Sequence, residues 1–350
     1  MNYPVVVRVD ANAPIGMGHI TRCHVLANAL QERGLAPALF LTRDYSAAVE
    51  FLESRRLPYR ILGAEMDFAS ECAEMRRTAL DVGARVLLFD LLDVTEELVE
   101  KTCPEGVLSV VLLDHLDPPT IRKGLVFNHN VVYGASTHPT RSQQDYLAGA
   151  SYVLLDPVFA EASRKSYFCE SVSRLFLNQG GGDPFNLTTK ILRALTPLRD
   201  QLKIEVVLGG AFAFDEELAP VLKHWGQQVT LHRMVPPAQV AALMMQAQMA
   251  HTAPGNMLYE LLTLGVPSIA ISHHEKHAAV AEFFAVQGAI EHLGIGVTLS
   301  EVLILERTRS LLHDEERRKS LHLVGRKIVD GLGAVRTADA ILKALHGEPT

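Results

Sequence analysis

Short apolar segments alternate with helical patterns along almost the whole of this chain. The segment Val5–Val9 is followed by apolar residues at three- and four-residue steps from Ile20 to Leu30, and the alternation then repeats. Segments this short and this apolar are typical of parallel strands that helices cover on both faces. We therefore expect an α/β fold with parallel sheets. The expected strands are Val5–Val9, Ala38–Thr42, Val86–Asp90, Leu108–Asp114, Leu125–Asn128, Leu175–Asn178, Ile204–Leu208, Val229–His232, Met249–Thr252 and Ser268–Ile271.

The chain has 350 residues, of which 48% are apolar, so it is large enough for two domains of ordinary size. The polar stretch Glu161–Ser173 precedes a second strand–loop–helix series that resembles the first. Open α/β sheets bind ligands at the carboxyl ends of their strands, so the first loop of each series should line a common cleft. We predict an N-terminal domain over 1–165, a C-terminal domain over 172–335, and a C-terminal helix or tail over 336–350.

Charge and composition exclude several classes of protein. The net charge is −7 and no basic block is present, which argues against nucleic acid as a partner. The four cysteines lie far apart without a C-x-x-C pair, so neither a disulfide framework nor a zinc site is expected. The most apolar stretch, Ala238–Ala250, is shorter than the roughly 20 residues that cross a bilayer. No signal peptide is visible, and we expect a cytoplasmic protein without an integral membrane segment.

The loop after the first expected strand is rich in candidate site residues. It carries Arg8, Asp10, Gly16, Gly18 and His19 before a helix begins. A strand, a glycine-bearing loop and a helix start together let backbone N–H groups face an anion. This loop is not a dinucleotide fingerprint, because the third glycine position holds another residue. The alternative interpretation is a tight turn in which the histidine caps the helix.

A second glycine loop, Gly180–Asp183, joins another expected strand to a helix that Asn186 or Thr188 would cap. Three adjacent glycines permit a close approach of the backbone to a ligand, and a helix start favours negative charge. A contact with phosphate is therefore favoured over a merely flexible turn.

Two further segments follow strands in the second half. Gly255 and Asn256 open a helix that carries Glu260, whose carboxylate is either a partner of the helix dipole, the simpler interpretation, or an acceptor for ribose hydroxyls. The segment His273–His277 is not H-E-x-x-H and has no third ligand nearby, so a ligand-facing loop is favoured over a metal site. Asp90 and His115 also lie at strand ends and are weaker candidates.

These motifs together resemble the PseG/SpsG group, the UDP-2,4-diacetamido-2,4,6-trideoxy-β-L-altropyranose hydrolases of pseudaminic acid biosynthesis and their relatives. The first loop fits the pattern R-x-D-x-S-x-x-I-G-x-G-H-x-x-R at Arg8, Asp10, Ile15, Gly16, Gly18, His19 and Arg22, with Asn12 where Ser is usual. Matches in the same order are Tyr146-Leu147, Gly180–Pro184 with Asn186–Thr188, Gly255 with Glu260, Gly265–Ser268 and Asp330–Ala334.

The resemblance implies a GT-B fold similar to MurG, with two Rossmann-like domains around a nucleotide-sugar cleft. It places UDP on the C-terminal domain and the sugar on the N-terminal domain, and it makes His19 the general base that activates water. It implies no metal and no cofactor. On this basis we expect His19, Asp10 and Lys276 to be catalytic. The expected substrate-binding residues are Arg8, Gly16, Gly18, Arg22, Gly181, Gly182, Asp183, Gly255, Asn256, Glu260, Glu275 and His277.

Two departures from the family pattern lie in this expected site. Glu275-Lys276-His277 stands where the family has an Asp/Glu-Asn-Gln run, and Gly255-Asn256-Met257 stands where it has Gly-Ser-Thr. Three functions stay open: a hydrolase that releases UDP and a diacetamido-trideoxy hexose, a glycosyltransferase with a UDP-linked or CMP-linked nonulosonic donor, and a nucleotide-sugar-binding module without activity. In the transferase, Lys276 or His277 would meet a phosphate or carboxylate of the donor or acceptor.

Overall fold

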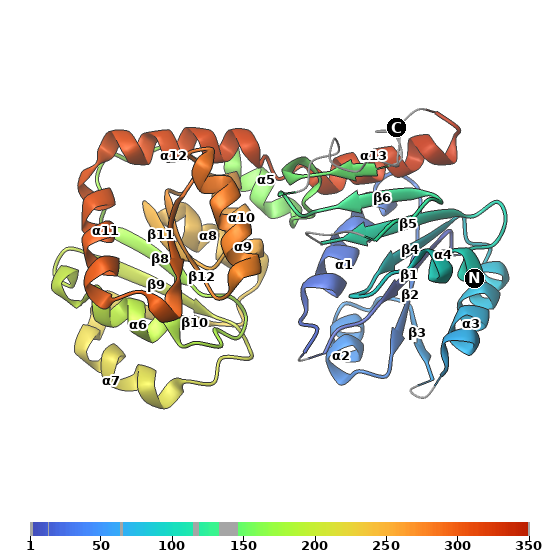
Figure 1. Cartoon of the computed structure of the whole chain (residues 1–350), viewed down its shortest axis with the longest axis horizontal. Helices are drawn as coiled ribbons and strands as arrows, with labels where there is room; N and C mark the ends of the chain where they lie inside the picture. The colour runs from blue at the N-terminus through green and yellow to red at the C-terminus, as the bar shows by residue number, and fades with distance from the viewer. Residues whose placement is uncertain (1–2, 13, 64–65, 115–118, 133–145, 349–350) are drawn as a thin grey trace. The chain divides into compact units, whose positions relative to one another are not determined.

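The fold is taken from a computed structural model, which describes residues 3–12, 14–63, 66–114, 119–132 and 146–348. The chain divides into two compact units. Unit 1 contains residues Met1–Leu154 and Leu332–Thr350, and unit 2 contains residues Leu155–Gly331. Each unit is a parallel sheet with helices on both faces (Figure 1).

Unit 1 has a seven-stranded sheet in the order β3-β2-β1-β4-β5-β6-β7, and all its pairings are parallel. Its strands are β1 (Val5–Val9), β2 (Ala38–Arg43), β3 (Tyr59–Leu62), β4 (Val86–Asp90), β5 (Leu108–Leu113), β6 (Leu125–Asn128) and β7 (Tyr146–Ala148). Its helices are α1 (Gly18–Gln31), α2 (Ser46–Ser54), α3 (Phe68–Asp81), α4 (Glu96–Thr102), the short 3₁₀ helix η2 (Ala150–Tyr152) and α13 (Gly333–Leu345).

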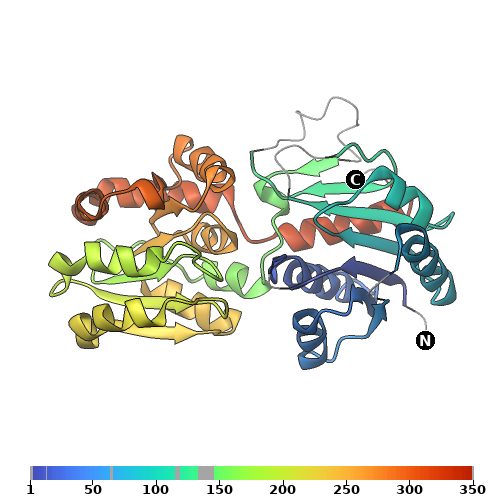
Figure 2. The ribbon, with the colours of Figure 1, turned by 60° about the horizontal axis from the view of Figure 1, so that its bottom comes forward.

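Successive side chains of β1 point to opposite faces of the sheet, which explains why the first three residues of this strand are all apolar. Val5 and Val7 pack with α1, α2 and α13 on one face, whereas Val6 packs with α3 and α4 on the other. Because successive side chains of a strand point to opposite faces, a strand covered on both faces must be apolar throughout. Figure 2 shows the C-terminal helix α13, in red, beside the blue helix α1.

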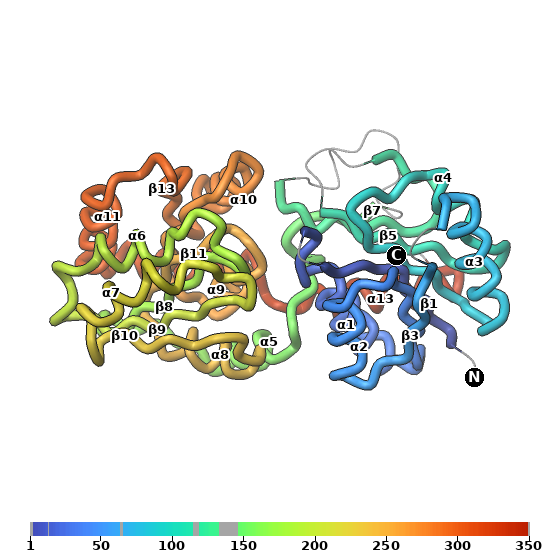
Figure 3. Tube along the Cα trace, turned by 90° about the horizontal axis from the view of Figure 1, so that it is seen from below, coloured from blue at the N-terminus to red at the C-terminus, as the bar shows by residue number. Residues whose placement is uncertain are grey.

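Unit 2 repeats this plan with six parallel strands in the order β10-β9-β8-β11-β12-β13, part of which Figure 3 shows along the row β10, β9, β8. Its strands are β8 (Arg174–Asn178), β9 (Lys203–Leu208), β10 (Val229–Arg233), β11 (Met249–Thr252), β12 (Ser268–Ser272) and β13 (Glu291–Ile295). Its helices are α5 (Pro157–Ser163), α6 (Leu187–Ala194), α7 (Asp215–Trp225), α8 (Pro237–Gln246), α9 (Asn256–Leu264), α10 (Glu275–Val286), α11 (Glu301–His313) and α12 (Glu315–Ile328), with the 3₁₀ helices η3 (Thr196–Leu198), η4 (Gly226–Gln228) and η5 (Gly296–Thr298).

All ten expected strands are present, with ends that differ by at most one residue. The sequence reasoning missed β3, β7 and β13, and each of these lies at an edge of its sheet. Edge strands are covered less completely, so β3 and β13 mix charged residues with apolar ones and lack the continuous apolar pattern. β7 has only three residues, which is too short for a pattern.

The unit boundaries differ from those that the sequence suggested. Unit 2 begins at Leu155, about ten residues before the expected change, and α5 packs against α8 and α9 of unit 2. The end of the chain is not a separate tail, because Ala338 and Ile341 of α13 are buried in the core of unit 1. The cleft between two domains stays a prediction.

In both units the strand order reverses beside the first strand, between β1 and β4 and between β8 and β11. Loops at the carboxyl ends of such neighbouring strands leave in opposite directions and create a crevice, where open α/β sheets bind ligands. The candidate sites therefore begin at the loops after β1 and β4 in unit 1, and after β8 and β11 in unit 2.

Candidate functional site

The central feature of unit 1 is a hydrogen bond between His19 and Asp90. His19 is the second residue of α1, and Asp90 is the last residue of β4, which lies beside β1. The distance from His19 Nδ1 to Asp90 Oδ1 is 2.7 Å. The histidine side chain is partly accessible, whereas the aspartate side chain is completely buried. The strand order thus brings together two residues that are 71 positions apart.

Asp90 is held ionised by the groups around it. Arg22 donates to both carboxylate oxygens, at 2.6 Å from Nε and 2.5 Å from Nη2, and Cys23 Sγ lies 3.3 Å from Oδ2. Burial alone would raise the pKa of Asp90, but the charge of Arg22 and the hydrogen bonds from Arg22 and His19 hold this pKa well below its usual range. Asp90 therefore carries a negative charge beside His19 at neutral pH.

An ionised carboxylate only accepts hydrogen bonds, so it fixes the tautomer of its histidine neighbour. His19 Nδ1 must carry the proton that Asp90 accepts, which leaves Nε2 with a lone pair. No described residue forms a hydrogen bond with Nε2. A histidine oriented in this way can take a proton at Nε2 while the aspartate stabilises the imidazolium that forms.

Arg8 and Asp10 lie in a buried network of ion pairs at the end of β1. Arg8 is 1% exposed, and its Nη1 and Nη2 donate to the Asp10 carboxylate at 2.6 and 2.8 Å while its Nε donates to Glu71 at 2.9 Å. Asp10 also accepts from the backbone N–H of Arg43 at 2.9 Å, and the Arg43 side chain bonds Glu71 at 2.6 Å. This buried network ties the end of β1 to β2 and α3, and the roles of Arg8 in substrate binding and of Asp10 in catalysis stay predictions.

The remaining part of the first loop is a closed turn. Gly16 N–H donates to Asn12 O at 2.7 Å, and Ile15 N–H donates to the Asn12 side chain at 2.8 Å. Gly16 has φ of +81°, which residues other than glycine rarely adopt. Asn12 therefore performs the loop-closing role at the position where the family has Ser, and Gly18 begins α1 directly before His19.

His129 is a residue that the sequence reasoning missed. It follows β6 directly and is 6% exposed, and neither ring nitrogen has a hydrogen-bond partner in the described part of the chain. Burial lowers its pKa to about 3, and the charge of Arg22 adds to this. Arg22 Nη1 also lies 3.9 Å from Asp114, which follows β5. The group around His19 thus extends along the carboxyl edge of the sheet to β6.

A cavity of about 390 Å³ lies next to this group. Its walls include Asp10, Arg43, Glu71 and Asp90 on the charged side and Phe68 on the apolar side. Small-molecule sites have volumes of roughly 300 to 1,000 Å³. Unit 1 therefore has a partly charged hollow of suitable size at the carboxyl ends of β1, β2 and β4.

The glycine loop of unit 2 follows β8. Gly180 has φ of +80° and Asp183 has φ of +42°, so the loop folds back on itself. The backbone N–H groups of Gly181, Gly182 and Asp183 have no acceptor in the described part of the chain. Successive backbone N–H groups in a turn of this kind form an anion-binding concavity. Gly209 supports the loop, since a Cβ at that position would lie 2.2 Å from the Gly181 carbonyl oxygen.

The Asp183 side chain is bound to the start of α6. Its two carboxylate oxygens accept from the backbone N–H groups of Leu187 and Thr188, each at 2.8 Å, and the residue is 1% exposed. It therefore already fills the N-terminus of α6 with negative charge. Asp183 thus caps α6, its contact with substrate stays a prediction, and the backbone N–H groups of Gly181 and Gly182 before the helix are the donors that a phosphate would meet.

The start of α9 is the other helix N-terminus that concerns the candidate site of unit 2. Gly255 precedes α9, and no described side chain caps the helix, whose first residue Asn256 is exposed. Glu260 lies one turn further along, with its Oε2 buried and without a hydrogen-bond partner in the described residues. Burial, together with the charge of Asp156, raises the pKa of Glu260 to about 8. At neutral pH this carboxyl keeps its proton and can bond a hydroxyl either as donor or as acceptor.

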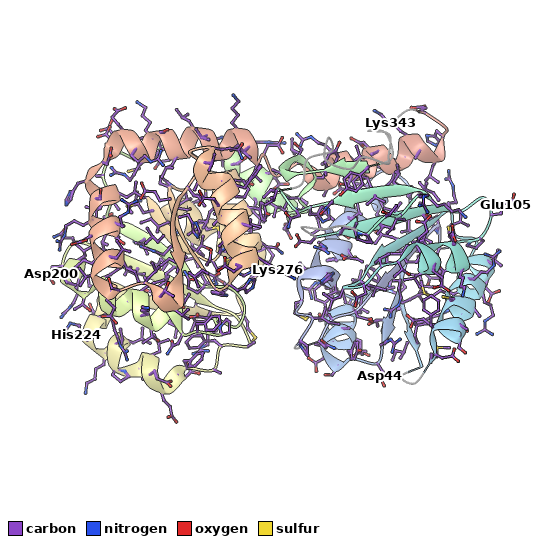
Figure 4. The ribbon with its side chains drawn as sticks, in the orientation of Figure 1. Asp44, Glu105, Asp200, His224, Lys276 and Lys343 are labelled. Carbon is purple, nitrogen blue, oxygen red and sulfur yellow. The ribbon has the colours of Figure 1, made fainter. Side chains whose placement is uncertain are left out.

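The residues of the segment after β12 differ in their exposure to solvent. His273 is 8% exposed and packs near the glycine loop, whereas Glu275 and Lys276 are exposed in the first turn of α10. Figure 4 shows Lys276 at the surface of unit 2. His277 is half-buried, and its ring centroid lies 5.3 Å from that of His273. His273 and His274 form the loop between β12 and α10, which begins at Glu275, and contact of this loop with a ligand stays a prediction.

Some predictions concern residues or properties that the structure describes only in part. His115 lies outside the described residues. Within the described residues, no group of three His, Cys, Asp or Glu side chains is placed to hold a metal ion. None of the helices in the described ranges is long and apolar enough to cross a membrane.

Each unit thus has its own group of predicted residues. In unit 1 the structure brings His19 and Arg22 together on Asp90, and Arg8 and Asp10 line the same cavity as Asp90. In unit 2 it brings Gly180, the residue before Gly181 and Gly182, close to His273, and Glu260 follows Gly255 on α9. Asp90 was named only as a weak candidate, although it is the partner that orients the histidine.

Comparison with known proteins gives one relative along the whole chain. The spore coat polysaccharide biosynthesis protein SpsG of Bacillus subtilis is 30% identical over 348 residues, which cover 98% of this chain and 98% of that protein. No protein-family model matches the chain.

Solved structures show the same fold at low sequence identity. MurG of Acinetobacter baumannii aligns with a TM-score of 0.69 at 11% identity, over 97% of this chain and 100% of that one. A structure of S. aureus MnaA with UDP aligns with a TM-score of 0.63 at 10% identity, over 98% of this chain and 96% of that one. The two parallel sheets and these alignments identify the fold as GT-B, as the sequence predicted.

Proposed function

This chain belongs to the SpsG family, and from that premise we propose that it is an enzyme that hydrolyses a nucleotide sugar. The relative is named for spore coat polysaccharide biosynthesis, which supports a role in supplying an activated or modified sugar. The proposed substrate is a UDP-linked 2,4-diacetamido-2,4,6-trideoxy hexose, as the resemblance of the sequence motifs implies. The proposed products are UDP and the free sugar.

The observation that carries this proposal is the oriented histidine of unit 1. His19 Nδ1 is bound to the buried, ionised Asp90 at 2.7 Å, and Nε2 is available to receive a proton. In the proposed reaction Nε2 takes a proton from water, and the water oxygen forms a bond to the anomeric carbon. The bond from this carbon to the UDP oxygen breaks, and UDP leaves with the electron pair. Asp90 stabilises the imidazolium meanwhile.

Unit 2 supplies suitable groups for the nucleotide. The free N–H groups of Gly181 and Gly182 and the uncapped start of α9 are donors for phosphate oxygens. Glu260 offers a buried carboxyl oxygen without a partner among the described residues, which fits a ribose hydroxyl. Such fixed donors also stabilise the charge that develops on UDP as it leaves. We accordingly assign the nucleotide to unit 2 and the reacting sugar to unit 1.

One observation favours transfer of the sugar to an acceptor as the second candidate function. Lys276 is exposed at the first turn of α10, where the family has a neutral amide. An exposed ammonium group is suited to a phosphate or carboxylate of an acceptor. In that case His19 would take its proton from an acceptor hydroxyl instead of from water.

The two functions are separated by supplying UDP-linked and CMP-linked deoxyamino sugars to the purified protein with and without acceptors. Hydrolysis predicts that UDP and free sugar appear in equal amounts when water is the sole acceptor. Strict dependence on an added acceptor would instead identify a transferase. Binding of the nucleotide sugar without turnover in either condition would leave only a binding function.

The general base is tested by His19→Ala. We expect turnover to fall about 10²-fold or more, because a positioned base contributes about that factor. KM should change much less than kcat, since the base acts on the water and not on the bound nucleotide. The matched control is His224→Ala, at an exposed histidine of α7 that Figure 4 labels in unit 2. Unchanged turnover in a folded His19→Ala protein would remove this role.

A further inference from the structure

His273 is a buried polar side chain that the proposed reaction does not use. It follows β12 directly and is 8% exposed. Its Nε2 is inaccessible to solvent and has no hydrogen-bond partner within the described ranges. A buried polar atom without a partner costs stability, so it calls for an explanation. One explanation is a ligand that completes the hydrogen bonds of the ring.

The ring of His273 lies against the glycine loop. A Cβ added to Gly180 would be 3.8 Å from His273 Cε1, the carbon between the two ring nitrogens. The ring of Phe185, in the same loop, stands edge-on to the imidazole with centroids 6.0 Å apart. The loop after β12 and the loop after β8 therefore meet at His273, although the strands β8 and β12 are separated in the sheet by β11.

This place is suited to a negatively charged ligand. The neighbouring N–H groups of Gly181, Gly182 and Asp183 also have no acceptor in the described residues. The nearby Asp183 carboxylate already accepts hydrogen bonds from the N–H groups of Leu187 and Thr188. The other titratable groups that face His273 are His274, next in the chain, and His277 on α10, and both are basic.

We propose that His273 binds a phosphate of the nucleotide together with the Gly181–Gly182 loop, and that it takes up a proton when the nucleotide binds. The proposal rests on the proposed function, because it requires that unit 2 is the nucleotide site. It assigns a nucleoside diphosphate as the ligand and a neutral-to-charged change of His273 as the event that accompanies binding.

The direction of this change follows from the surroundings of the ring. Burial lowers the pKa of His273 below the ordinary histidine value, against the opposing charge of Asp183, so the empty site holds a neutral ring at pH 7. A phosphate in contact with the ring favours the charged form and raises the pKa. Binding must then become tighter as the pH falls, by at most about tenfold for each pH unit, until the empty site is protonated as well.

The test is titration calorimetry of the whole protein with UDP from pH 6 to pH 8.5, in two buffers of different ionisation enthalpy. The variants are His273→Gln, which keeps a polar side chain of similar size but cannot become charged, and His224→Gln as the matched control, at an exposed histidine of α7 outside the site. Uridine, which lacks phosphate, is the control ligand. UDP and Glu260 titrate in every variant, so their contributions cancel when wild type and His273→Gln are compared.

For wild type we expect about one proton to be taken up per UDP at pH 7, and affinity about tenfold higher at pH 6.5 than at pH 8. His273→Gln should lose both effects, His224→Gln should keep both, and uridine should show neither. If wild type binds UDP without proton uptake, or if His273→Gln keeps the full uptake, the inference is wrong while the nucleotide site stands. If UDP does not bind at all, the inference and the assignment of the nucleotide to unit 2 fail together. If His273→Gln does not fold, His273→Asn, which also cannot become charged, takes its place in the comparison with wild type.

Discussion

At the scale of single residues, Asp90 is important both for the fold and for the proposed reaction. It ends β4, is completely buried, and accepts hydrogen bonds from His19 and Arg22. A buried charge is tolerated only when it is paired and hydrogen-bonded, so the same contacts that orient the histidine also hold the carboxylate in the core. Substitution at this position therefore has two measurable effects.

The first effect is on catalysis. Asp90→Asn preserves the size of the side chain but removes the charge that orients His19 and stabilises its imidazolium. We expect kcat to fall by about 10²-fold or more with little change in nucleotide affinity. Steady-state kinetics together with UDP binding measure the two quantities. A comparable loss in Asp114→Asn, whose carboxylate lies 3.9 Å from Arg22, would show that the effect is not specific to the histidine partner.

The second effect is on acid stability. The pKa of Asp90 is lower in the folded protein than in the unfolded chain, so its ion pair stabilises the fold above the unfolded pKa of about 4. This stability is lost as the pH falls from that value toward the folded pKa. Thermal unfolding followed between pH 6 and pH 3 should therefore show a steeper loss in wild type than in Asp90→Asn. Equal pH dependence of the two proteins would contradict the assignment.

At the scale of elements, unit 2 has two helix starts at its candidate site, and they are not equivalent. The carboxylate of Asp183 occupies the N-terminus of α6, whereas no described side chain caps α9. An anion is favoured where the N–H groups are still free. The nucleotide phosphates are thus expected at the glycine loop and at α9, and not at α6 itself.

Gly181→Ala tests this at a position where folding is not affected. A Cβ at Gly181 would meet no atom within 4 Å, and the residue does not have a positive φ, so stability should stay the same or rise by about 0.4–1 kcal/mol. A phosphate on the loop would be crowded by the added methyl group, so UDP affinity should fall about tenfold or more. Calorimetry and thermal unfolding measure the two values. Unchanged affinity would place the phosphates elsewhere.

At the scale of the whole molecule, the chain leaves unit 1 after Leu154 and returns to it at Leu332. The returning helix α13 buries Ala334, Ala338 and Ile341 in the core beside α1. The final helix is thus a permanent part of the N-terminal unit, and unit 1 cannot complete its core until the whole chain is present.

Ile341→Ala should therefore destabilise unit 1 and leave unit 2 unchanged. Ile341 is completely buried, and removal of such a side chain costs about 2–5 kcal/mol. Calorimetry should show a lower unfolding temperature for unit 1 only, and limited proteolysis should show faster cleavage within unit 1 only. Val335→Ala, on the same helix but at a residue that is 37% exposed, is the control and should change stability much less. A loss confined to unit 2 would contradict the division of the chain.

The sequence by itself determined the α/β class, ten of the thirteen strands in the described part of the chain, and the glycine loops that follow β1 and β8. These signals are local, because the period of apolar residues and the conformational needs of a turn are set within a few neighbouring residues. The same local reasoning missed the edge strands β3, β7 and β13. Helices cover edge strands less completely, so these strands lack a continuous run of apolar residues.

Only the tertiary structure decided what the polar residues do. The motif around His19 placed Arg8, Asp10 and His19 together as site residues, but the sheet turns Arg8 and Asp10 into a buried ion pair and leaves His19 accessible. The surroundings of Asp90, His129 and His273 are formed by residues far away in the chain. Hydrogen bonds and burial of this kind depend on which strands become neighbours, and the spacing of residues along one segment does not contain that information.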